Sequence, residues 1–368
     1  MQMAFDLAAK GKGSTSPNPM VGAVVVKGTR VIATGWHKRR GADHAEIVAL
    51  KKAGGPPRLS PSARLAKGGR ARGAKLYVTL EPCFHYGRTP PCVAQVIAGG
   101  IREVVIGMVD PNPLTRGKSI AKLRRAGIKV RTGILRPDAE RLNEIFVKYM
   151  RSQMPFVAAK CAQTLDGKIA TVTGESKWIT SSKTRDYARR VRDEFDAILV
   201  GVNTVLRDDP RLNGARATKR LKKIILDSSL KTPLKARLFK SVLPGDCFIA
   251  VTKKAAASTV ERFRQRGVNV IVCPAKAGGV DLKWLWKALA KEEITSILME
   301  GGARVIGSAL KEKLVDKLYI YVAPKIIGDQ DALSSVVGVG TVNIGRSIRL
   351  KNLTSRNIGQ DILLTGYV

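Results

Sequence analysis

Short apolar runs rich in β-branched residues alternate with amphipathic stretches along the first half of the chain. The runs predict strands and the stretches predict helices, because the two elements repeat their buried positions with different periods. In order along the chain, we expect strands over 21–26, 75–80, 103–107 and 128–133, and helices over 45–53, 91–98 and 119–126. This order is typical of an α/β domain with a largely parallel sheet.

The same alternation resumes in the second half. A helix predicted over 137–154 is followed by Pro155, which marks a plausible domain boundary. Beyond it we expect strands over 156–161, 197–202, 223–226, 246–251, 268–273 and 297–300, and helices over 182–192, 257–266, 282–290 and 305–312. A chain of 368 residues exceeds the size at which one core keeps growing, so two domains are predicted, over 1–150 and 151–368.

Composition narrows the class of protein. Hydrophobic residues make up 44% of the chain, enough for two cores, yet the longest apolar runs are far too short to cross a bilayer. Residues 1–10 include Asp6 and lack the apolar region of a secretory signal. Five cysteines, an odd number, argue against a disulfide framework. We therefore expect a protein of the reducing cytoplasm, with no membrane partner.

The charge is strongly positive, with 65 Lys and Arg against 29 Asp and Glu and a net charge of +36. Such a field attracts polyanions and steers phosphorylated substrates. The densest basic stretch, over 47–80, holds eight basic residues and no acidic one, and its part over 55–69 is rich in Gly, Pro and Ser. No aromatic residues interleave these charges as a base-stacking platform requires. We interpret this part as a solvated loop and expect only weak, non-specific binding of nucleic acid.

The tripeptide His44-Ala45-Glu46 and two cysteines downstream supply candidates for a metal site. Zn²⁺ favours imidazole and thiolate donors, and a catalytic zinc keeps one position open for a water whose pKa falls to roughly 7. We predict that His44, Cys83 and Cys92 are the ligands. Glu46 is predicted as the general acid/base, which is the arrangement of a hydrolytic deaminase. Glu46 opens a predicted helix and Cys83 follows a predicted strand, so chance is a poor explanation for the combination.

The spacing of the cysteines leaves alternatives open. Eight residues separate Cys83 from Cys92, where the common pattern of zinc nucleobase deaminases has two. This loop brings two more donors, His85 and Arg88, toward the site. A nucleic-acid base deaminase, acting for example on tRNA, would explain both the zinc pattern and the charge. An RNA-binding protein with a structural zinc would need His85 as a fourth ligand.

The second half contains none of the three histidines, so its chemistry is easier to explain if a cofactor carries the reaction. Gly301 and Gly302 lie between an apolar strand and a predicted helix, where backbone N–H groups can receive a phosphate. The dinucleotide fingerprint G-x-G-x-x-G is absent, so the signal by itself is weak.

Segments spread over nearly the whole chain resemble the bifunctional deaminase/reductase family of riboflavin biosynthesis. The deaminase half of that family is similar at 15–24, 44–46, 79–83, 87–92 and 110–113, and the reductase half at 164–168, 174–180, 208–210 and 300–302. The sequence GRTPPC at 87–92, together with His44-Ala45-Glu46, accounts for the long loop between the cysteines. The resemblance implies an α/β fold, with a cytidine-deaminase-like three-layer domain followed by a dihydrofolate-reductase-like domain.

The resemblance also implies that the protein uses zinc and NADPH as cofactors, acts on a phosphorylated substrate and forms a homo-oligomer. The substrate would be a 2,5-diamino-6-ribosylamino-pyrimidinone 5′-phosphate, deaminated on its ring and then reduced at the ribose C1′ to a ribityl chain. Implied substrate contacts are Asn18, His85, Arg88, Ser176, Arg192, Leu212, Arg216 and Glu300. Implied cofactor contacts are Ala162, Trp178, Thr204, Asp208, Ser228, Gly302, Ala303, Arg304, Val305, Ile306, Gly307 and Ser308.

Two features depart from the family pattern. The family has a short link after the His-Ala-Glu helix, whereas residues 55–69 read as a basic insertion. The family's substrate-binding arginine comes three residues after the leucine that follows the Asp-Asp-Pro segment, whereas Arg216 comes four residues after Leu212. Simpler interpretations also exist for three residues: Trp178 as a core aromatic, Asp208 as a turn-former before Pro210, and Arg192 as a solvated helix residue.

Overall fold

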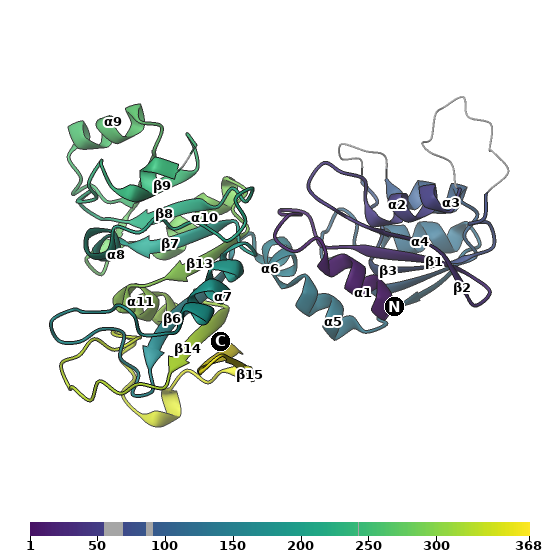
Figure 1. The fold of residues 1–368 in the computed structure, drawn as a ribbon. Helices are drawn as coiled ribbons and strands as arrows, with labels where there is room; N and C mark the ends of the chain where they lie inside the picture. Colours follow the sequence, from purple (N-terminus) through teal and green to yellow (C-terminus); the bar gives the residue numbers. More distant parts are fainter. Residues whose placement is uncertain (55–68, 86–90, 242) are drawn as a thin grey trace. The chain divides into compact units, whose positions relative to one another are not determined.

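The structure is a computed structural model that describes residues 1–54, 69–85, 91–241 and 243–368. The chain forms two compact units, Met1–Gln153 and Met154–Val368 (Figure 1). Arg88 and residues 55–68 of the predicted insertion lie outside the described residues. The insertion begins and ends at one place, because a Cβ on Gly69 would lie 2.0 Å from the carbonyl oxygen of Gly54.

The first unit contains a five-stranded sheet in the order β2-β1-β3-β4-β5. Its strands are β1 (Gly22–Lys27), β2 (Arg30–Trp36), β3 (Lys75–Leu80), β4 (Glu103–Met108) and β5 (Lys129–Thr132). Strands β3, β4 and β5 are parallel, but β1 runs antiparallel to both β2 and β3. The prediction of a largely parallel sheet is therefore wrong for this unit. The cause is the unpredicted strand β2, which returns along β1 through a tight turn at Gly28, where φ is +59°.

Helices cover both faces of this sheet. They are α1 (Gln2–Ala9), α2 (Ala45–Lys52), α3 (Cys92–Ala98), α4 (Lys118–Arg125), α5 (Arg136–Leu142) and α6 (Glu144–Ser152). A Cβ on Gly22 would lie 1.9 Å from the carbonyl oxygen of Ala4 in α1, and one on Gly35 would lie 2.4 Å from that of Ala45 in α2. Gly35 pairs with Ala23 rather than with Gly22, and adjacent strand residues face opposite sides. Helices α1 and α2 therefore cover opposite faces, and the unit has three layers.

The helix predicted over 137–154 is two helices, α5 and α6. Asn143 separates them with φ −107° and ψ 27°, outside the helical region. Its buried side chain accepts a hydrogen bond from the Met20 N–H (2.7 Å) and donates one to the Met20 carbonyl oxygen (2.9 Å). These bonds tie the end of α5 to the segment before β1, which a pattern of apolar positions cannot foresee.

The second unit is built on a nine-stranded sheet in the order β10-β9-β8-β7-β13-β6-β14-β16-β15. The strands are β6 (Phe156–Thr164), β7 (Ala197–Gly201), β8 (Lys222–Leu226), β9 (Cys247–Val251), β10 (Asn269–Val272), β13 (Ser296–Glu300), β14 (Lys317–Ala323), β15 (Lys351–Ile358) and β16 (Asp361–Tyr367). The sheet is parallel from β10 to β14, and the C-terminal hairpin of β15 and β16 adds an antiparallel edge. A two-stranded hairpin of β11 (Ala275–Lys276) and β12 (Gly279–Val280) lies apart from it.

Apolar side chains pack on both faces of this sheet. The helices are α7 (Ser182–Arg192), α8 (Val202–Asp208), α9 (Ala257–Gln265), α10 (Leu282–Lys291) and α11 (Ala303–Lys311), with 3-10 turns η1 (Arg237–Ser241) and η2 (Ile344–Arg346). Leu199 and Ile224 belong to one buried cluster, and their neighbours Ile198 and Ile225 to another. This alternation places a core on each face of the parallel strands, as in α/β proteins generally.

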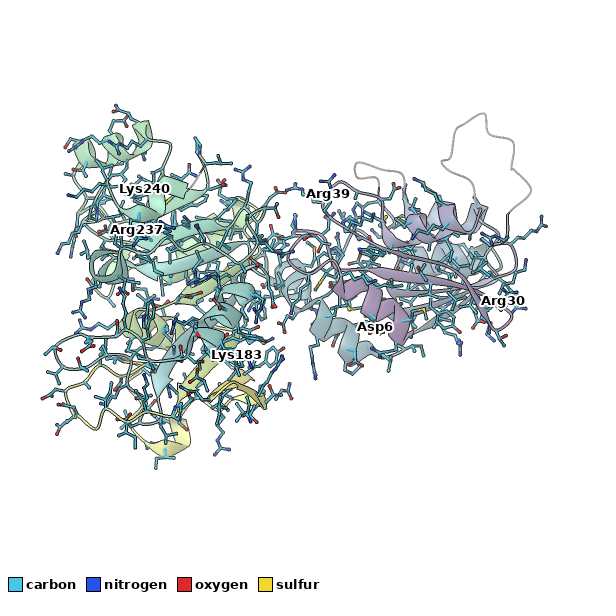
Figure 2. All side chains as sticks on the ribbon, viewed as in Figure 1. Asp6, Arg30, Arg39, Lys183, Arg237 and Lys240 are labelled. Carbon is cyan, nitrogen blue, oxygen red and sulfur yellow. The ribbon has the colours of Figure 1, made fainter. Side chains whose placement is uncertain are left out.

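Other expectations concern the surface and the cysteines. Basic side chains project from both units, among them Arg30 and Arg39 in the first and Lys183, Arg237 and Lys240 in the second (Figure 2). All five cysteines are free thiols. Within the described part of the chain, no helix is both long enough and apolar enough to span a bilayer.

Candidate functional site

The three predicted metal ligands come together in the first unit. His44 is the residue just before α2, Cys83 follows the end of β3, and Cys92 is the first residue of α3. His44 Nδ1 lies 3.1 Å from Cys92 Sγ and 3.6 Å from Cys83 Sγ. The donor atoms of all three residues lie within 4.8 Å of one another, close enough for one ion. Among the described residues, this is the only such group.

Glu46 lies in the first turn of α2, buried beside these ligands. Burial raises the pKa of its carboxyl group to about 7. Its Oε2 atom is buried and has no hydrogen-bond partner among the described residues. A buried carboxylate oxygen without a partner is costly, so it indicates a group that a ligand or a bound water completes.

The three predicted ligand side chains shift one another's pKa values. A hydrogen bond with Cys83 raises the pKa of His44 to about 9. Hydrogen bonding from Cys92 and from His44 lowers the pKa of Cys83, and the Cys92 N–H also donates to Cys83 Sγ at 3.2 Å. The hydrogen bond with Cys83 and burial raise the pKa of Cys92 well above its usual value. One His and two Cys are the donor set that Zn²⁺ prefers, and with three protein ligands a fourth position remains for water.

Asn18 is positioned beside the ligands by a histidine that the sequence analysis did not select. Asn18 Nδ2 lies 3.2 Å from His37 Nε2, and His37 Nδ1 lies 3.2 Å from the carbonyl oxygen of Asp43, the residue before His44. The rings of His37 and His44 meet edge to face at 5.2 Å. The sequence signal was available, because His37 is one of only three histidines in the chain.

Glu81 and His85 stabilise the loop that carries Cys83. The buried Glu81 carboxylate accepts four N–H groups at 3.0–3.3 Å, from Asp110 and from three residues at the start of α4. It thereby anchors the end of β3 to the N-terminus of a helix. His85 Nδ1 lies 3.1 Å from Thr115 Oγ1, and His85 is not part of the ligand group. The structural-zinc alternative, which needs His85 as a fourth ligand, is therefore not supported.

In the second unit, several predicted cofactor contacts meet at one edge of the parallel sheet. Ala162 lies near the carboxyl end of β6, Thr204 follows β7, Ser228 follows β8 and Gly302 follows β13. These four strands are adjacent and parallel, so their carboxyl ends lie at the same edge. Ligands of open α/β sheets bind at this edge, where the strand order changes direction.

The turn after β13 leaves its backbone open to close approach by a ligand. Gly301 and Gly302 have φ values of +84° and +80°, which residues with a Cβ rarely adopt. The side chains of Ala303 and Ile306 are buried, whereas Arg304 and Ser308 are exposed. A Cβ on Gly307 would lie 1.9 Å from the carbonyl oxygen of Val337, so Gly307 has a packing role. Val305, the remaining predicted contact of this turn, is half-buried.

Two predicted substrate contacts, Arg192 and Glu300, form a paired group. Arg192 Nε and Nη2 donate to the two carboxylate oxygens of Glu300 at 2.7 and 2.8 Å. Lys160 Nζ lies 4.0 Å from Glu300 Oε2. Although burial opposes ionisation, the charges of Arg192 and Lys160 lower the pKa of Glu300 to about 2. Arg192 is thus no solvated helix residue, and the sequence analysis missed Lys160, whose signal is a lysine within an apolar strand.

The remaining predicted contacts of the second unit include Trp178, Asp208, Ser176 and Leu212. Trp178 is 61% exposed and stacks under the guanidinium of Arg185 at 4.2 Å, so it is not a core aromatic. Asp208, the last residue of α8, lies 3.7 Å from Lys177 Nζ. Half-buried Ser176 lies in the segment between β6 and α7. Leu212 is 4% exposed, and its side chain packs within an apolar cluster.

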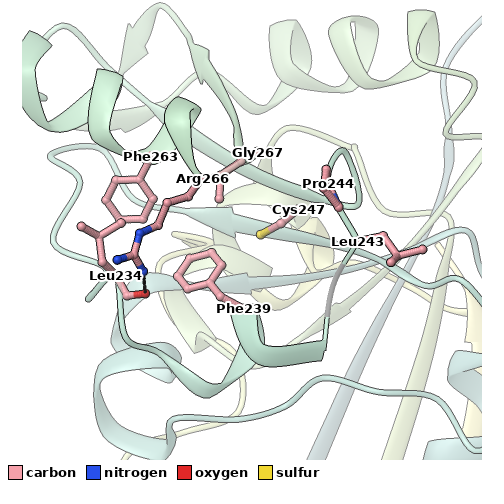
Figure 3. Close-up of a pocket in the computed structure, with 9 residues that line it drawn as sticks. Leu234, Phe239, Leu243, Pro244, Cys247, Phe263, Arg266 and Gly267 are labelled. Atoms are coloured by element: carbon pink, nitrogen blue, oxygen red, sulfur yellow. Dashed lines mark hydrogen bonds between the residues drawn. The ribbon is translucent and has the colours of Figure 1, made fainter.

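A cavity of about 180 Å³, lined by apolar side chains and by Arg266, lies away from this edge of the sheet (Figure 3). Phe239, Phe263 and Leu234 line it, with the Cys247 thiol among them. Cys247 is the first residue of β9, so the cavity lies at the amino ends of the strands, opposite the predicted cofactor contacts. Burial raises the pKa of the Cys247 thiol to about 12, which makes it unreactive. The cavity is therefore no part of the candidate site.

Comparison with known proteins matches both units. Residues 1–108 match the cytidine and deoxycytidylate deaminase zinc-binding region, and residues 155–364 match the RibD C-terminal domain. The riboflavin biosynthesis protein RibD of Aquifex aeolicus is 42% identical over 366 residues, covering 99% of this chain and 96% of that protein. The Escherichia coli protein of the same name is 35% identical over 379 residues, covering 99% and 97%. The solved structure of Acinetobacter baumannii RibD has a TM-score of 0.86 at 34% identity, covering 100% and 97%.

Fold and site together define an enzyme in which a zinc-dependent deaminase is joined to a reductase. The chain belongs to the RibD family of bifunctional riboflavin-biosynthesis proteins. It is both a hydrolase and an oxidoreductase, and its cofactors are zinc and NADPH. The predicted fold class and the resemblance are confirmed. The alternative of a tRNA base deaminase is not favoured, because it leaves the whole second unit unexplained.

Proposed function

We propose that deamination takes place in the first unit, with His44, Cys83 and Cys92 as zinc ligands and Glu46 as the general acid/base. The observation that carries this proposal is the Oε2 atom of Glu46, which is buried beside three converging ligand atoms and has no hydrogen-bond partner in the described part of the chain. Zinc, when bound, lowers the pKa of a water to roughly 7. Glu46 would exchange a proton with that water, and burial raises the pKa of its carboxyl group to about 7, suited to exchanging protons near neutral pH.

In this proposal Glu46 transfers protons while a C–O bond forms and the C–N bond breaks. The water oxygen bonds to the ring carbon that carries the amino group. Glu46 accepts a proton from the water and returns it to the departing nitrogen, so the C–N bond breaks and ammonia leaves. Asn18, held by His37, orients the pyrimidine ring, and His85 and Arg88 contact the phosphate from the loop between the cysteines.

We infer that reduction takes place in the second unit, at the carboxyl ends of β6, β7, β8 and β13. NADPH, when bound, supplies a hydride to C1′ of the opened ribosyl group. The glycine turn at Gly301 and Gly302 suits the close approach of a phosphate to backbone N–H groups at the start of α11. Arg192, Glu300 and the neighbouring Lys160 would hold the polar substrate at the same edge.

The substrate proposed is 2,5-diamino-6-ribosylamino-pyrimidinone 5′-phosphate, processed first in the predicted domain over 1–150 and then in the predicted domain over 151–368. The excess of basic residues favours a phosphorylated substrate by raising its local concentration. We also propose that the enzyme works in the cytoplasm as a homo-oligomer. Its five cysteines are free thiols, and two of them form the candidate metal site with His44. Free thiols are suited to a reducing compartment.

Two variants separate the proposed sites. Glu46→Gln should lower ammonia release from the diaminopyrimidine by about 10²–10⁴ but leave NADPH oxidation intact when the deaminated intermediate is supplied. Glu300→Gln should impair NADPH oxidation with the deaminated intermediate but leave ammonia release intact. If either substitution impaired both reactions equally in a folded protein, the assignment of one reaction to each unit would be wrong.

A further inference from the structure

Lys223 is a buried lysine in β8, where only Lys222 precedes it and three apolar residues follow. It lies in β8 with 2% exposure, next to Ile224 and Ile225, which are fully buried. Burying an ammonium group is costly unless polar partners surround it. Lys223 Nζ donates to the carbonyl oxygen of Leu238 at 3.0 Å and to Oδ1 of Asn213 at 3.2 Å.

Asn213 connects this lysine to the proposed reductase site. Its side chain accepts from Lys223, and its backbone carbonyl oxygen accepts from Arg192 Nη1 at 2.7 Å. Arg192 in turn donates from Nε and Nη2 to the Glu300 carboxylate. A continuous series of hydrogen bonds therefore runs from Lys223 through Asn213 and Arg192 to Glu300.

The same loop is held a second time by Asp193, the residue after Arg192. Its carboxylate accepts the N–H of Ala215 at 3.1 Å and the N–H of Arg216 at 3.0 Å. A Cβ on Gly214 would lie 2.0 Å from Asp193 Oδ1, so this close contact requires glycine. The loop over 212–216 is thus clamped to the end of α7, and Lys223 fixes its Asn213 side chain from the core.

We propose that Lys223 is a positioning residue for the reduction. By fixing Asn213, it orients the Arg192 guanidinium and, through it, the Glu300 carboxylate toward the ribosylaminopyrimidine substrate. Three N–H donors of Arg192 are engaged with Glu300 and Asn213, out of the five that a guanidinium carries. The remaining donors are then held in one plane before substrate arrives, which lowers the entropy cost of binding. The inference rests on the proposed substrate contacts of Arg192 and Glu300.

The test compares two lysines on one strand of the full-length enzyme. Lys223→Met removes the buried donor, and Lys222→Met, whose Nζ donates to the carbonyl oxygen of Glu292 at the surface, is the matched control. NADPH oxidation is followed with the deaminated intermediate at saturating NADPH. Lys223→Met should raise KM for the intermediate at least about tenfold, because a lost hydrogen bond to a charged group is worth that much. The Kd for NADPH should stay within about twofold, and Lys222→Met should change neither value beyond about twofold.

Asn213 gives an independent readout, because it is exposed and its substitution leaves the core intact. Asn213→Ala should raise KM about tenfold, whereas Asn213→Asp, which keeps an oxygen for Lys223, should restore KM to within about threefold of the wild-type value. The double variant Lys223→Met/Asn213→Ala should be no worse than the worse single variant, because both changes break the same connection.

Unchanged KM in a folded Lys223→Met variant would overturn the proposal. If Lys223→Met does not fold, Asn213→Ala decides, and an unchanged KM there overturns it equally. Glu300→Gln separates the two levels of inference. If Glu300→Gln impairs reduction while the Lys223 and Asn213 variants do not, only the positioning role fails. If Glu300→Gln also leaves reduction unchanged, the substrate contacts themselves are wrong.

Discussion

Arg192 and Glu300, which lie 108 positions apart in the chain, form a bidentate ion pair with N–O distances of 2.7 and 2.8 Å. The pair lies at the carboxyl ends of the parallel strands of the second sheet. Arg192 ends α7, and Glu300 ends β13. The pair therefore joins a helix terminus to the strand end from which the glycine turn begins. A bidentate arginine–carboxylate pair fixes the direction of both groups more firmly than a lysine would.

The ion pair should contribute to stability in a pH-dependent way. Removing one partner of a buried pair leaves the other charge uncompensated, so Glu300→Gln should lower the free energy of unfolding of the second unit by about 3 kcal/mol at pH 7. The pKa of Glu300 falls from its usual 4.5 to about 2 in the folded protein. The stabilisation is therefore fully present above about pH 4.5 and is lost as the pH falls from there toward 2.

Thermal unfolding of wild type and Glu300→Gln at several pH values measures this effect. The difference in Tm between them should be constant from pH 7 to about pH 5 and should shrink below pH 4. A difference that grew on acidification would mean that Glu300 is not ionised in the folded protein at neutral pH.

The roles within the zinc site can be separated by substitution. Glu46→Gln should retain one zinc per chain but lower deamination by about 10²–10⁴, the usual contribution of general acid/base catalysis. Cys83→Ser should instead lose the metal. Zinc content and ammonia release, measured on the same preparations, check both expectations. If Glu46→Gln lost zinc while Cys83→Ser kept it, the assigned roles would be reversed.

Many elements with a clear pattern of apolar positions were predicted from the sequence, but β14 and β16, which also contain apolar runs, were not. The strand over 75–80 and the helix over 182–192 occur with the predicted bounds. Strand β15 was missed because its residues up to Asn357 are exposed, so no alternation marks it. Strand β2 was missed for a different reason: its buried positions do alternate, but they are Ala33 and Gly35, which are too small to give an apolar signal. The break at Asn143 depends on a hydrogen bond to Met20, 123 positions away, which local sequence does not reveal.

The metal ligands were predictable because zinc chemistry restricts them to a few residue types in a short pattern. His44, Cys83 and Cys92 were selected on that ground, and the structure brings them together. Lys160 and His37 were not selected, because each contacts a residue that is distant in sequence, Glu300 and Asn18. Lys223 was not selected, because the sequence alone does not show that it is buried. Arg216 was selected from the sequence, but its side chain makes a contact within the protein. Its side chain donates to the carbonyl oxygen of Asp193 at 3.0 Å, which gives it a structural contact whatever its role toward substrate.

The second unit should function alone. It has its own sheet and cores, and it begins at Met154. A fragment over 154–368 should bind NADPH and oxidise it when given the deaminated intermediate. Calorimetry with NADPH checks this expectation, and a folded fragment that fails to bind NADPH would contradict the cofactor assignment.

The basic insertion should be dispensable for deamination. Because Gly54 and Gly69 already lie against each other, deletion of residues 55–68 should allow the chain to be rejoined without moving α2 or β3. Steady-state deamination should remain within about twofold of the wild-type rate. Loss of salt-sensitive RNA binding on deletion, measured by titration at two salt concentrations, would instead indicate a polyanion site in this segment.

The most direct test of the whole account is a product balance on the full-length enzyme with 2,5-diamino-6-ribosylamino-pyrimidinone 5′-phosphate, zinc and NADPH. Ammonia release should precede NADPH oxidation, and the two should reach equal amounts. Glu46→Gln should block both, and added deaminated intermediate should restore only NADPH oxidation. Sequencing of tRNA incubated in parallel should show no deaminated base. NADPH oxidation that proceeds without ammonia release, or site-specific deamination of the tRNA, would contradict the account.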